Sequence, residues 1–404
     1  MNKNIKLAVA GAVLALSASA NAGIVIPAGD WTLDVNGNVN AFANWTKFKG
    51  DTTTVAGGLP GVKQAHEDAT QGINTGLLPA WLGFTGKTRQ NDTDVEFTIS
   101  FQPNVSDQGG AVHGDSSTPL NRQAYVSFGD KSWGSIKLGK DIGVFASDAI
   151  LNDMTLLGVG AGAANSGAAT TLGGIGSGYI YAAWKGQIAY TTPNFNGFQA
   201  TVAIVNPNQI AGAETAQSTA RTTYQDRFGL EGKASYSFAA DAFSGKIWVG
   251  GASYKVKTAT TASTDVKEYT ATAADIGANI NAGNAGLTAY YYTGEGVGTT
   301  LFGNLGSGSA GQKRDSDGGY VQATYILPTK TKLGLAYGIS KLDGYATETP
   351  TTMVKENDRI TLGLYHPLTK HLNLVAEYND VEAQSHSGLK NEARTGSLGA
   401  ILFF

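Results

Sequence analysis

Cysteine is absent from the 404-residue sequence, and charged residues and histidines are few. The absence of cysteine excludes disulfide scaffolds, thiol catalysis and cysteine-ligated zinc sites. Charged residues make up 15% of the chain, whereas they make up about 25% of an ordinary soluble domain. The formal net charge of -3 gives no reason to expect a nucleic-acid partner. The 5 histidines are widely scattered, which disfavours a histidine-built metal site.

Long apolar runs are also missing, since no stretch beyond the N-terminus approaches the roughly 18 apolar residues that a membrane-spanning helix needs. The N-terminus combines two lysines, a short apolar run and an Ala-Asn-Ala cleavage signal that ends at Ala22. This order of features predicts a secretory signal peptide over residues 1–22 and one mature domain over residues 23–404. An N-terminal membrane anchor is disfavoured because the apolar run is too short to span about 30 Å. The exported chain is therefore periplasmic, released or an outer-membrane barrel.

Alternation of apolar and polar residues with period two is the main positive signal. It is present around residues 95–102, 227–238, 359–364 and 372–379. Successive side chains of a strand point to opposite faces, and a barrel in lipid is apolar outside and polar inside. Charged residues of these segments fall on the polar face, so we expect them on a lumen wall: Arg227, Glu231, Lys233, Arg359 and Glu377.

A soluble β-sandwich alternates in the same way, so the lengths of the connections help to choose between the two. Seven short polar turns alternate strictly with eight long stretches rich in Gly, Ser, Thr and Ala. This order predicts an all-β fold, a 16-stranded antiparallel transmembrane β-barrel with short periplasmic turns and long extracellular loops. Both termini then lie on the side of the short turns.

The C-terminal strand runs to the last residue, and its alternate members Leu398, Ala400, Leu402 and Phe404 are apolar. Termini of soluble domains usually fray, whereas a terminal strand in a barrel closes the sheet and removes its edge. We predict that Phe404 is the C-terminal assembly signal, through which this strand meets the barrel-assembly machinery.

Several segments resemble trimeric Gram-negative general porins, particularly those of the Neisseria and Bordetella type. The matching segments are 122–126 (RQAYV), 133–140 (WGSIKLGK), 143–145 (GVF), 148–157 and 193–198 (PNFNGF), together with terminal Phe404. The resemblance implies a sixteen-strand homotrimer in the outer membrane of a Gram-negative bacterium, in contact with lipid and lipopolysaccharide. Each monomer would carry its own pore, narrowed by an inward-folded third loop.

The third long loop, Asp141 to Gly178, is the longest of the eight and corresponds in position to that constriction. By resemblance, Asp148 and Asp153 are its acidic residues, and Asp148 stands near the start of a short helix, where a carboxylate is favoured. The resemblance places wall cations opposite the loop. Across a water-filled gap of about 8 Å, each pair of opposite charges would interact by roughly 0.5 kcal/mol in bulk water.

Arg122 matches one of these wall cations, and Lys185 is an approximate match for another. Trp81 stands where the family commonly has arginine, so this constriction is expected to be less basic and more aromatic. In the period-two alternation, Arg122 falls on the same face as Ala124 and Val126, which is the apolar face and not the polar one. A strand at a trimer interface would allow this placement.

These features predict a water-filled channel for passive diffusion of ions and small hydrophilic solutes, with a size cutoff, weak charge selectivity and no cofactor. The main alternative is a substrate-selective channel with an aromatic and polar binding track that includes Trp81. A barrel enzyme is disfavoured because none of the histidines has a catalytic neighbourhood. A secreted adhesin or sandwich without a channel is the third alternative.

Overall fold

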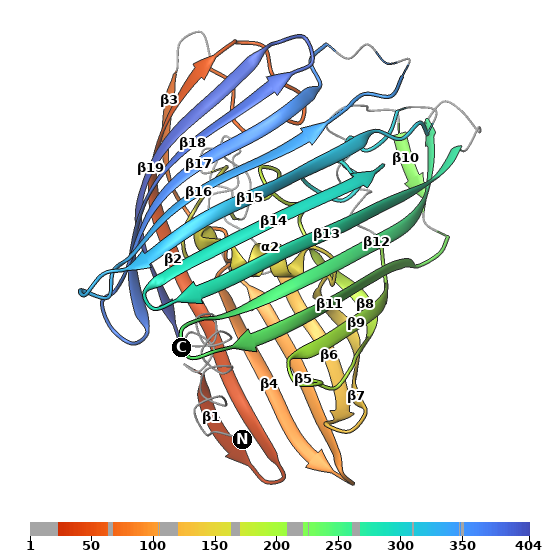
Figure 1. Cartoon of the computed structure of the whole chain (residues 1–404), viewed down its shortest axis with the longest axis vertical. Coiled ribbons are helices and arrows are strands. Elements are labelled where there is room, and N and C mark those ends of the chain that lie inside the picture. Colours follow the sequence, from red (N-terminus) through yellow and green to blue (C-terminus); the bar gives the residue numbers. More distant parts are fainter. Residues whose placement is uncertain are drawn as a thin grey trace.

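The chain forms one antiparallel sheet that closes on itself as a barrel (Figure 1). The computed structural model describes residues 23–63, 68–103, 105, 120–162, 170–207, 221–224, 226–260, 267–308, 311–346, 348 and 351–404. The predicted signal peptide, residues 1–22, lies outside these ranges. The barrel closes where β19 (Lys390–Phe403) pairs with β2 (Trp31–Gly50). At the seam, the Phe404 backbone N–H donates to the Gly37 carbonyl and the Gly37 N–H donates to the Phe404 carbonyl.

Sixteen strand positions make up the described wall, which confirms the predicted barrel size. Two positions are each shared by consecutive segments: β3 (Ala69–Asn74) with β4 (Trp81–Gln90), and β10 (Arg221–Tyr224) with β11 (Gly229–Ala239). At the seam, β1 (Ile24–Ala28) pairs with the part of β2 that lies beyond the end of β19. The remaining strands are β5 (Thr93–Gln102), β6 (Leu120–Asp130), β7 (Gly134–Ile142), β8 (Trp184–Thr191), β9 (Phe198–Val205), β12 (Ser244–Thr260), β13 (Lys267–Ala282), β14 (Ala285–Glu295), β15 (Asp315–Ile326), β16 (Lys332–Leu342), β17 (Val354–Pro367) and β18 (Leu372–Ser385).

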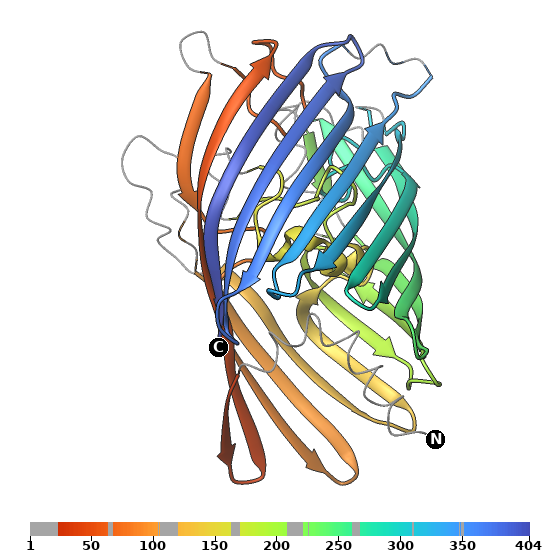
Figure 2. The same cartoon turned by 60° about the vertical axis from the view of Figure 1, so that its left-hand side comes forward.

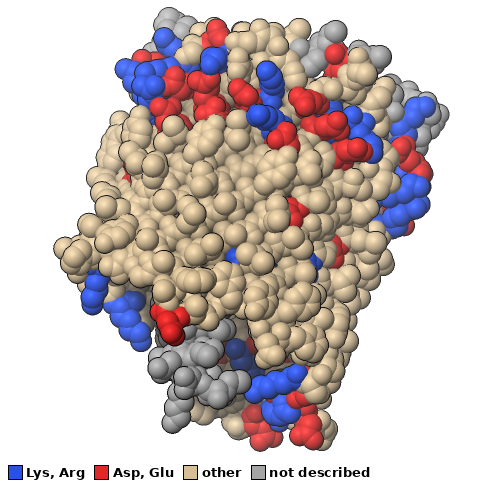
Figure 3. Space-filling view, viewed as in Figure 1, with Lys and Arg blue, Asp and Glu red and all other residues tan. Residues whose placement is uncertain are grey.

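The alternation of the sequence becomes the two faces of this wall. In β17, for example, Ile360 and Leu362 point outward and are exposed, whereas Arg359 and Thr361 point inward and are buried. Figure 3 shows a broad, mostly uncharged band across the outer face, with charged residues gathered toward its two ends. An apolar outer band with a polar interior is the arrangement that lipid requires of a barrel. Among the described residues, no helix is long and apolar enough to cross a membrane.

Loop three, the connection from the end of β7 at Ile142 to the start of β8 at Trp184, folds into the barrel (Figure 2). It carries the short helix α2 (Ser147–Asn152) and the 3₁₀ turn η1 (Met154–Leu157). Apolar residues of the loop form a core with the inner faces of β12 to β15, and Phe302 from the β14–β15 connection joins this core. The Phe302 ring lies 6.2 Å from that of Phe145 and 4.1 Å from that of Tyr254. The main core therefore lies between loop three and one half of the wall.

Candidate functional site: loop three and the lumen wall

Glu231 on β11 holds the start of loop three. Its carboxylate accepts hydrogen bonds from the backbone N–H groups of Val144, at 2.6 Å, and Phe145, at 3.0 Å. It also accepts from the Lys185 ammonium at 2.8 Å and from the Tyr254 hydroxyl. Both Glu231 and Lys185 are buried. The two residues pair with each other on the inner side of the wall and act as an anchor.

Asp148 in α2 contacts two wall lysines directly. Its carboxylate accepts from Lys233 on β11 at 2.8 Å and from Lys246 on β12. Burial on its own would raise the pKa of the Asp148 carboxyl, but the two ammonium groups outweigh it and hold the pKa below its ordinary value. Asp148 therefore contacts β11 and β12 directly, because the helix packs against this part of the wall.

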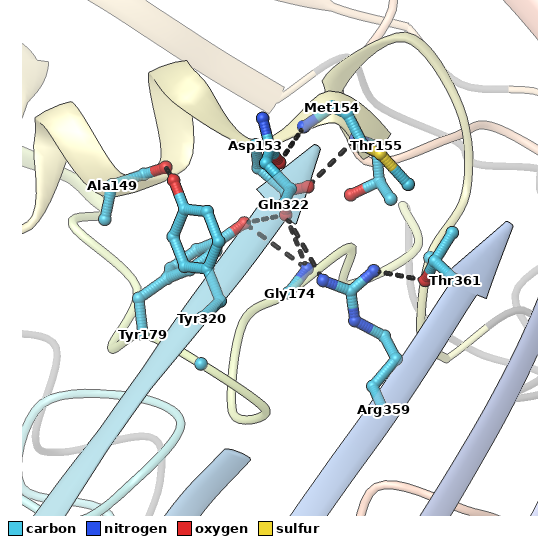
Figure 4. Close-up of polar contacts among 12 residues, drawn as sticks. Ala149, Asp153, Met154, Thr155, Gly174, Tyr179, Tyr320, Gln322, Arg359 and Thr361 are labelled. Atoms are coloured by element: carbon cyan, nitrogen blue, oxygen red, sulfur yellow. Dashed lines mark hydrogen bonds and ion pairs between the residues drawn. The ribbon is translucent and has the colours of Figure 1, made fainter. Parts of the chain in front are cut away.

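Asp153 is held at the other end of the helical segment by four groups (Figure 4). Its carboxylate accepts from the backbone N–H of Thr155 and of Gly174, both at 2.9 Å, and from the Tyr179 hydroxyl at 2.8 Å. Arg359 on β17 completes the set with an ion pair at 3.8 Å, in which each side chain is 1% exposed. Asp153 thus caps η1 and ties it to the wall at Arg359.

The middle of loop three is fastened by two further wall residues. Gln322 on β15 accepts from the Met154 N–H at 2.9 Å. Glu377 on β18 accepts from the N–H groups of Val159, at 3.0 Å, and Gly160, at 2.9 Å. Buried backbone donors need such partners because water is excluded from the contact. Wall acids on β11 and β18 therefore satisfy loop backbone groups in addition to lining the lumen.

Arg122 points inward because β6 contains a β-bulge. Ser100 on β5 pairs with Gln123 on β6, and the next residue, Phe101, pairs with Asn121. Arg122 therefore has no partner on β5 and is the extra residue of the bulge. A bulge re-aims the side chain of the extra residue. Arg122 is 8% exposed as a result, and its parity with the apolar set is explained by this local irregularity.

The Arg122 guanidinium lies over two tryptophan rings. Its central carbon is 4.2 Å from the ring centroid of Trp81 and 4.3 Å from that of Trp184. The Trp81 indole N–H donates to the Asn36 side-chain oxygen at 3.2 Å, which fixes the ring. Trp184 was not predicted, although it directly precedes the candidate Lys185.

Arg227 is the one expected wall residue that precedes its strand. It lies two residues before the start of β11, where its side chain is 49% exposed and pairs with Asp226 at 3.1 Å. Its predicted place on the lumen wall is corrected to the rim, because the hydrogen-bonded part of β11 begins only at Gly229.

Asp275 on β13 is a wall residue that was not predicted, and it accepts a hydrogen bond from the Ala146 N–H at 3.3 Å. The alternation of β13 residues between the two faces of the wall could have indicated from the sequence that Asp275 points inward.

Polar side chains line the wall of β5 to β7, on strands that carry none of these anchors. Lys137 pairs with Asp141, which also accepts from the Gln123 amide at 2.9 Å. Nearer the short turns, a cavity of about 860 Å³ opens onto the inner wall, where Lys87 and Glu96 form an ion pair at 3.4 Å. Within the described part of the chain, no group of three or more His, Asp or Glu could hold a metal ion.

An apolar outer band around a polar interior, with a loop folded inside, defines the class of outer-membrane channels. The Gram-negative porin family matches residues 7–386, and the chain belongs to this family. It is therefore an outer-membrane protein that forms a channel for passive diffusion. The resemblance noted from the sequence is confirmed at this level, and the closed barrel excludes a sandwich.

Solved structures share the fold at low sequence identity. The outer membrane channel DcaP of Acinetobacter baumannii is 16% identical, with a TM-score of 0.67 over 94% of this chain and 99% of that one. An anion-selective porin from Comamonas acidovorans is 16% identical, with a TM-score of 0.61 over 93% and 100%. The trimer form of OmpT from Vibrio cholerae is 12% identical, with a TM-score of 0.53 over 93% and 99%. Among curated proteins, none matches this chain significantly.

Proposed function

We propose that this protein is a general porin in which ions and small hydrophilic solutes diffuse between loop three and the wall of β4 to β8. The observation that carries this proposal is the placement of the loop anchors. Glu231, Gln322 and Glu377 hold loop three against β11 to β18. The polar side chains of β5 to β7 then face the remaining space, which is bounded by the loop and sets the size cutoff.

Charge selectivity in this passage is weak because the loop carboxylates are neutralised locally. Asp148 contacts Lys233 and Lys246, and Asp153 is paired with Arg359. Paired charges produce a smaller field in the lumen than separated ones. No chemical step is proposed for the protein, and no cofactor.

The test is single-channel conductance of the purified, detergent-extracted protein in a planar bilayer, combined with uptake of neutral solutes of graded size into proteoliposomes. We expect steady conductance, a small zero-current potential in a salt gradient, and flux linear in solute concentration up to a sharp size limit. A correctly folded barrel that conducts no current would contradict the proposal.

A substrate-selective channel is the second candidate, favoured by the stacking of Arg122 on Trp81 and Trp184. Aromatic rings and a buried cation on the wall of the passage can bind a solute as well as pass it. Flux that saturates with concentration, or conductance blocked by one solute at low concentration, would favour this candidate over the general porin.

We also propose an oligomeric state and a membrane orientation for the channel. The protein forms a homotrimer, a proposal supported by the family and by the trimer form of Vibrio cholerae OmpT. Currents that close in three equal steps would support three pores, and a single step would contradict them. The short turns face the periplasm, and the outer band contacts lipid and, at the opposite end, lipopolysaccharide.

Export and insertion supply two further proposals. Residues 1–22 are removed on export, so N-terminal sequencing of the mature protein should begin at Gly23. The terminal strand, ending in Phe404, is the part that the barrel-assembly machinery reads. Deletion of Phe404 should lower the yield of folded barrel in the outer membrane, whereas an unchanged yield would reject that role.

A further inference from the structure

We propose that Arg122, Trp81 and Trp184 form a binding subsite that favours organic anions with a flat apolar body, such as aromatic carboxylates, over inorganic anions. The proposal rests on the proposed function, since it requires solutes to pass along the wall of β4 to β8. It adds to that function a class of solute and the residues that recognise it.

The first observation concerns the ion pairing of Arg122. Among the described residues, no carboxylate lies within ion-pair distance of its guanidinium, whereas Lys185, Lys233 and Arg359 each have one. The nearby Asp141 is engaged by Lys137. Stacking on aromatic rings stabilises the cation but leaves its charge in place. A positive potential therefore remains at this point of the wall.

The second observation is the orientation of the guanidinium. The guanidinium carbon lies over the rings of Trp81 and Trp184 at nearly equal distances, so an anion would bind the N–H groups that the rings leave uncovered. The Arg122 Nε is buried and has no hydrogen-bond partner among the described residues, so one donor of the guanidinium is left unsatisfied. The planar edge of arginine matches the two oxygens of a carboxylate, which explains why we assign this class of anion rather than a spherical ion.

The third observation is the apolar surface beside that edge. Trp81 and Trp184 are both only partly buried, so part of each indole remains accessible next to the cation. Aromatic solutes gain from offset or edge contacts with such rings. An aromatic carboxylate can place its charge at Arg122 and its ring against an indole, and neither acetate nor an uncharged aromatic alcohol can do both.

The subsite is held in place before a solute arrives. The β-bulge fixes the direction of Arg122, the bond to Asn36 fixes Trp81, and Trp184 is paired with Ile142 in the β7–β8 ladder. Groups that are already ordered lose little conformational freedom on binding. Selectivity at this point is therefore built into the wall and does not require loop three to move.

The experiment measures block of single-channel current by three probes: benzoate, acetate and benzyl alcohol. In the unmodified protein we expect benzoate to reduce the current at concentrations at least about tenfold lower than the other two, which corresponds to about 1.4 kcal/mol. Arg122→Gln should abolish the difference between benzoate and acetate, and Trp81→Leu should reduce it. The control is Arg394→Gln, which alters an outward-facing arginine of β19 paired with Asp380 and should leave the block unchanged.

The outcomes separate this proposal from the function on which it rests. A conducting channel in which benzoate and acetate block equally overturns the subsite, as does a benzoate block that survives Arg122→Gln. A folded protein with no conductance overturns the porin proposal itself. If Arg122→Gln does not fold, Arg122→Lys keeps the charge and loses the planar edge, so a weakened preference for benzoate is expected and an unchanged one contradicts the proposal.

Discussion

The ammonium group of Lys185 donates a 2.8 Å hydrogen bond to the carboxylate of Glu231, and both side chains are almost fully buried. The pair joins β8 to β11 across the strand between them, at the point where loop three begins. Because Glu231 also binds two backbone N–H groups of the loop, one carboxylate positions both the wall and the constriction.

Glu231→Ala should therefore destabilise the barrel and loosen loop three. Removing one partner leaves a buried ammonium without its counter-charge, which costs about 3–5 kcal/mol. We expect a lower unfolding temperature in detergent and larger fluctuations of the open-channel current. Glu268→Ala is the matched control, because Glu268 forms exposed pairs with Lys255 and Lys257 and such pairs contribute about 0–1 kcal/mol each. Equal unfolding temperatures for the two variants would contradict the anchoring role.

Asp148→Asn and Asp153→Asn should have different consequences. Asp148→Asn frees Lys233 and Lys246, whose side chains are 25% and 32% exposed, so the zero-current potential in a salt gradient should shift toward anion preference. Asp153→Asn leaves the buried Arg359 without its partner, so a lower unfolding temperature is expected with a smaller shift in potential. A larger shift from Asp153→Asn would show that Asp153, and not Asp148, faces the passage.

The contact between Asp148 and its two lysines also predicts a pH dependence. Its folded-state pKa is lowered, whereas an unfolded aspartate titrates near about 3.9. The ion pairs therefore stabilise loop three fully above about pH 4, and this contribution is lost as the pH falls through the lower folded value. The part of the current fluctuations that depends on Asp148 should stay constant from neutral pH to about 4 and increase below it. Asp148→Asn should lack this acid transition, and its persistence there would assign the transition to another carboxylate.

Gly37 should tolerate no side chain at the seam of the barrel. A Cβ atom there would lie 2.1 Å from the Trp81 carbonyl oxygen and 2.8 Å from the Phe404 ring. Backbone would have to shift, so we expect Gly37→Ala to cost about 1–3 kcal/mol and to lower the yield of folded barrel. Gly396→Ala in the neighbouring β19 is the control, because a Cβ there meets nothing within 4 Å. Similar yields for both variants would contradict this prediction.

The wall was more predictable from the sequence than the site. Residues such as Ile360 and Arg359 alternate along β17, and this pattern directly reports which face meets lipid. The alternation placed Arg122 on the wrong face, because a bulge depends on the register of two strands and not on the sequence of one. Trp184 and Gln322 were missed for a related reason, since their roles come from partners distant in the sequence.

By itself, the sequence determined the class of this protein: period-two alternation, the order of short and long connections, and a strand that runs to Phe404 together specify a closed barrel in lipid. These are local properties, set by the pleat of a strand and the solvent on each face. Only the tertiary structure decided what the charged residues do. Asp148 and Asp153 are loop anchors because the packed loop brings Lys233 and Arg359 to them, and electrostatic interactions depend on distances that local sequence does not encode.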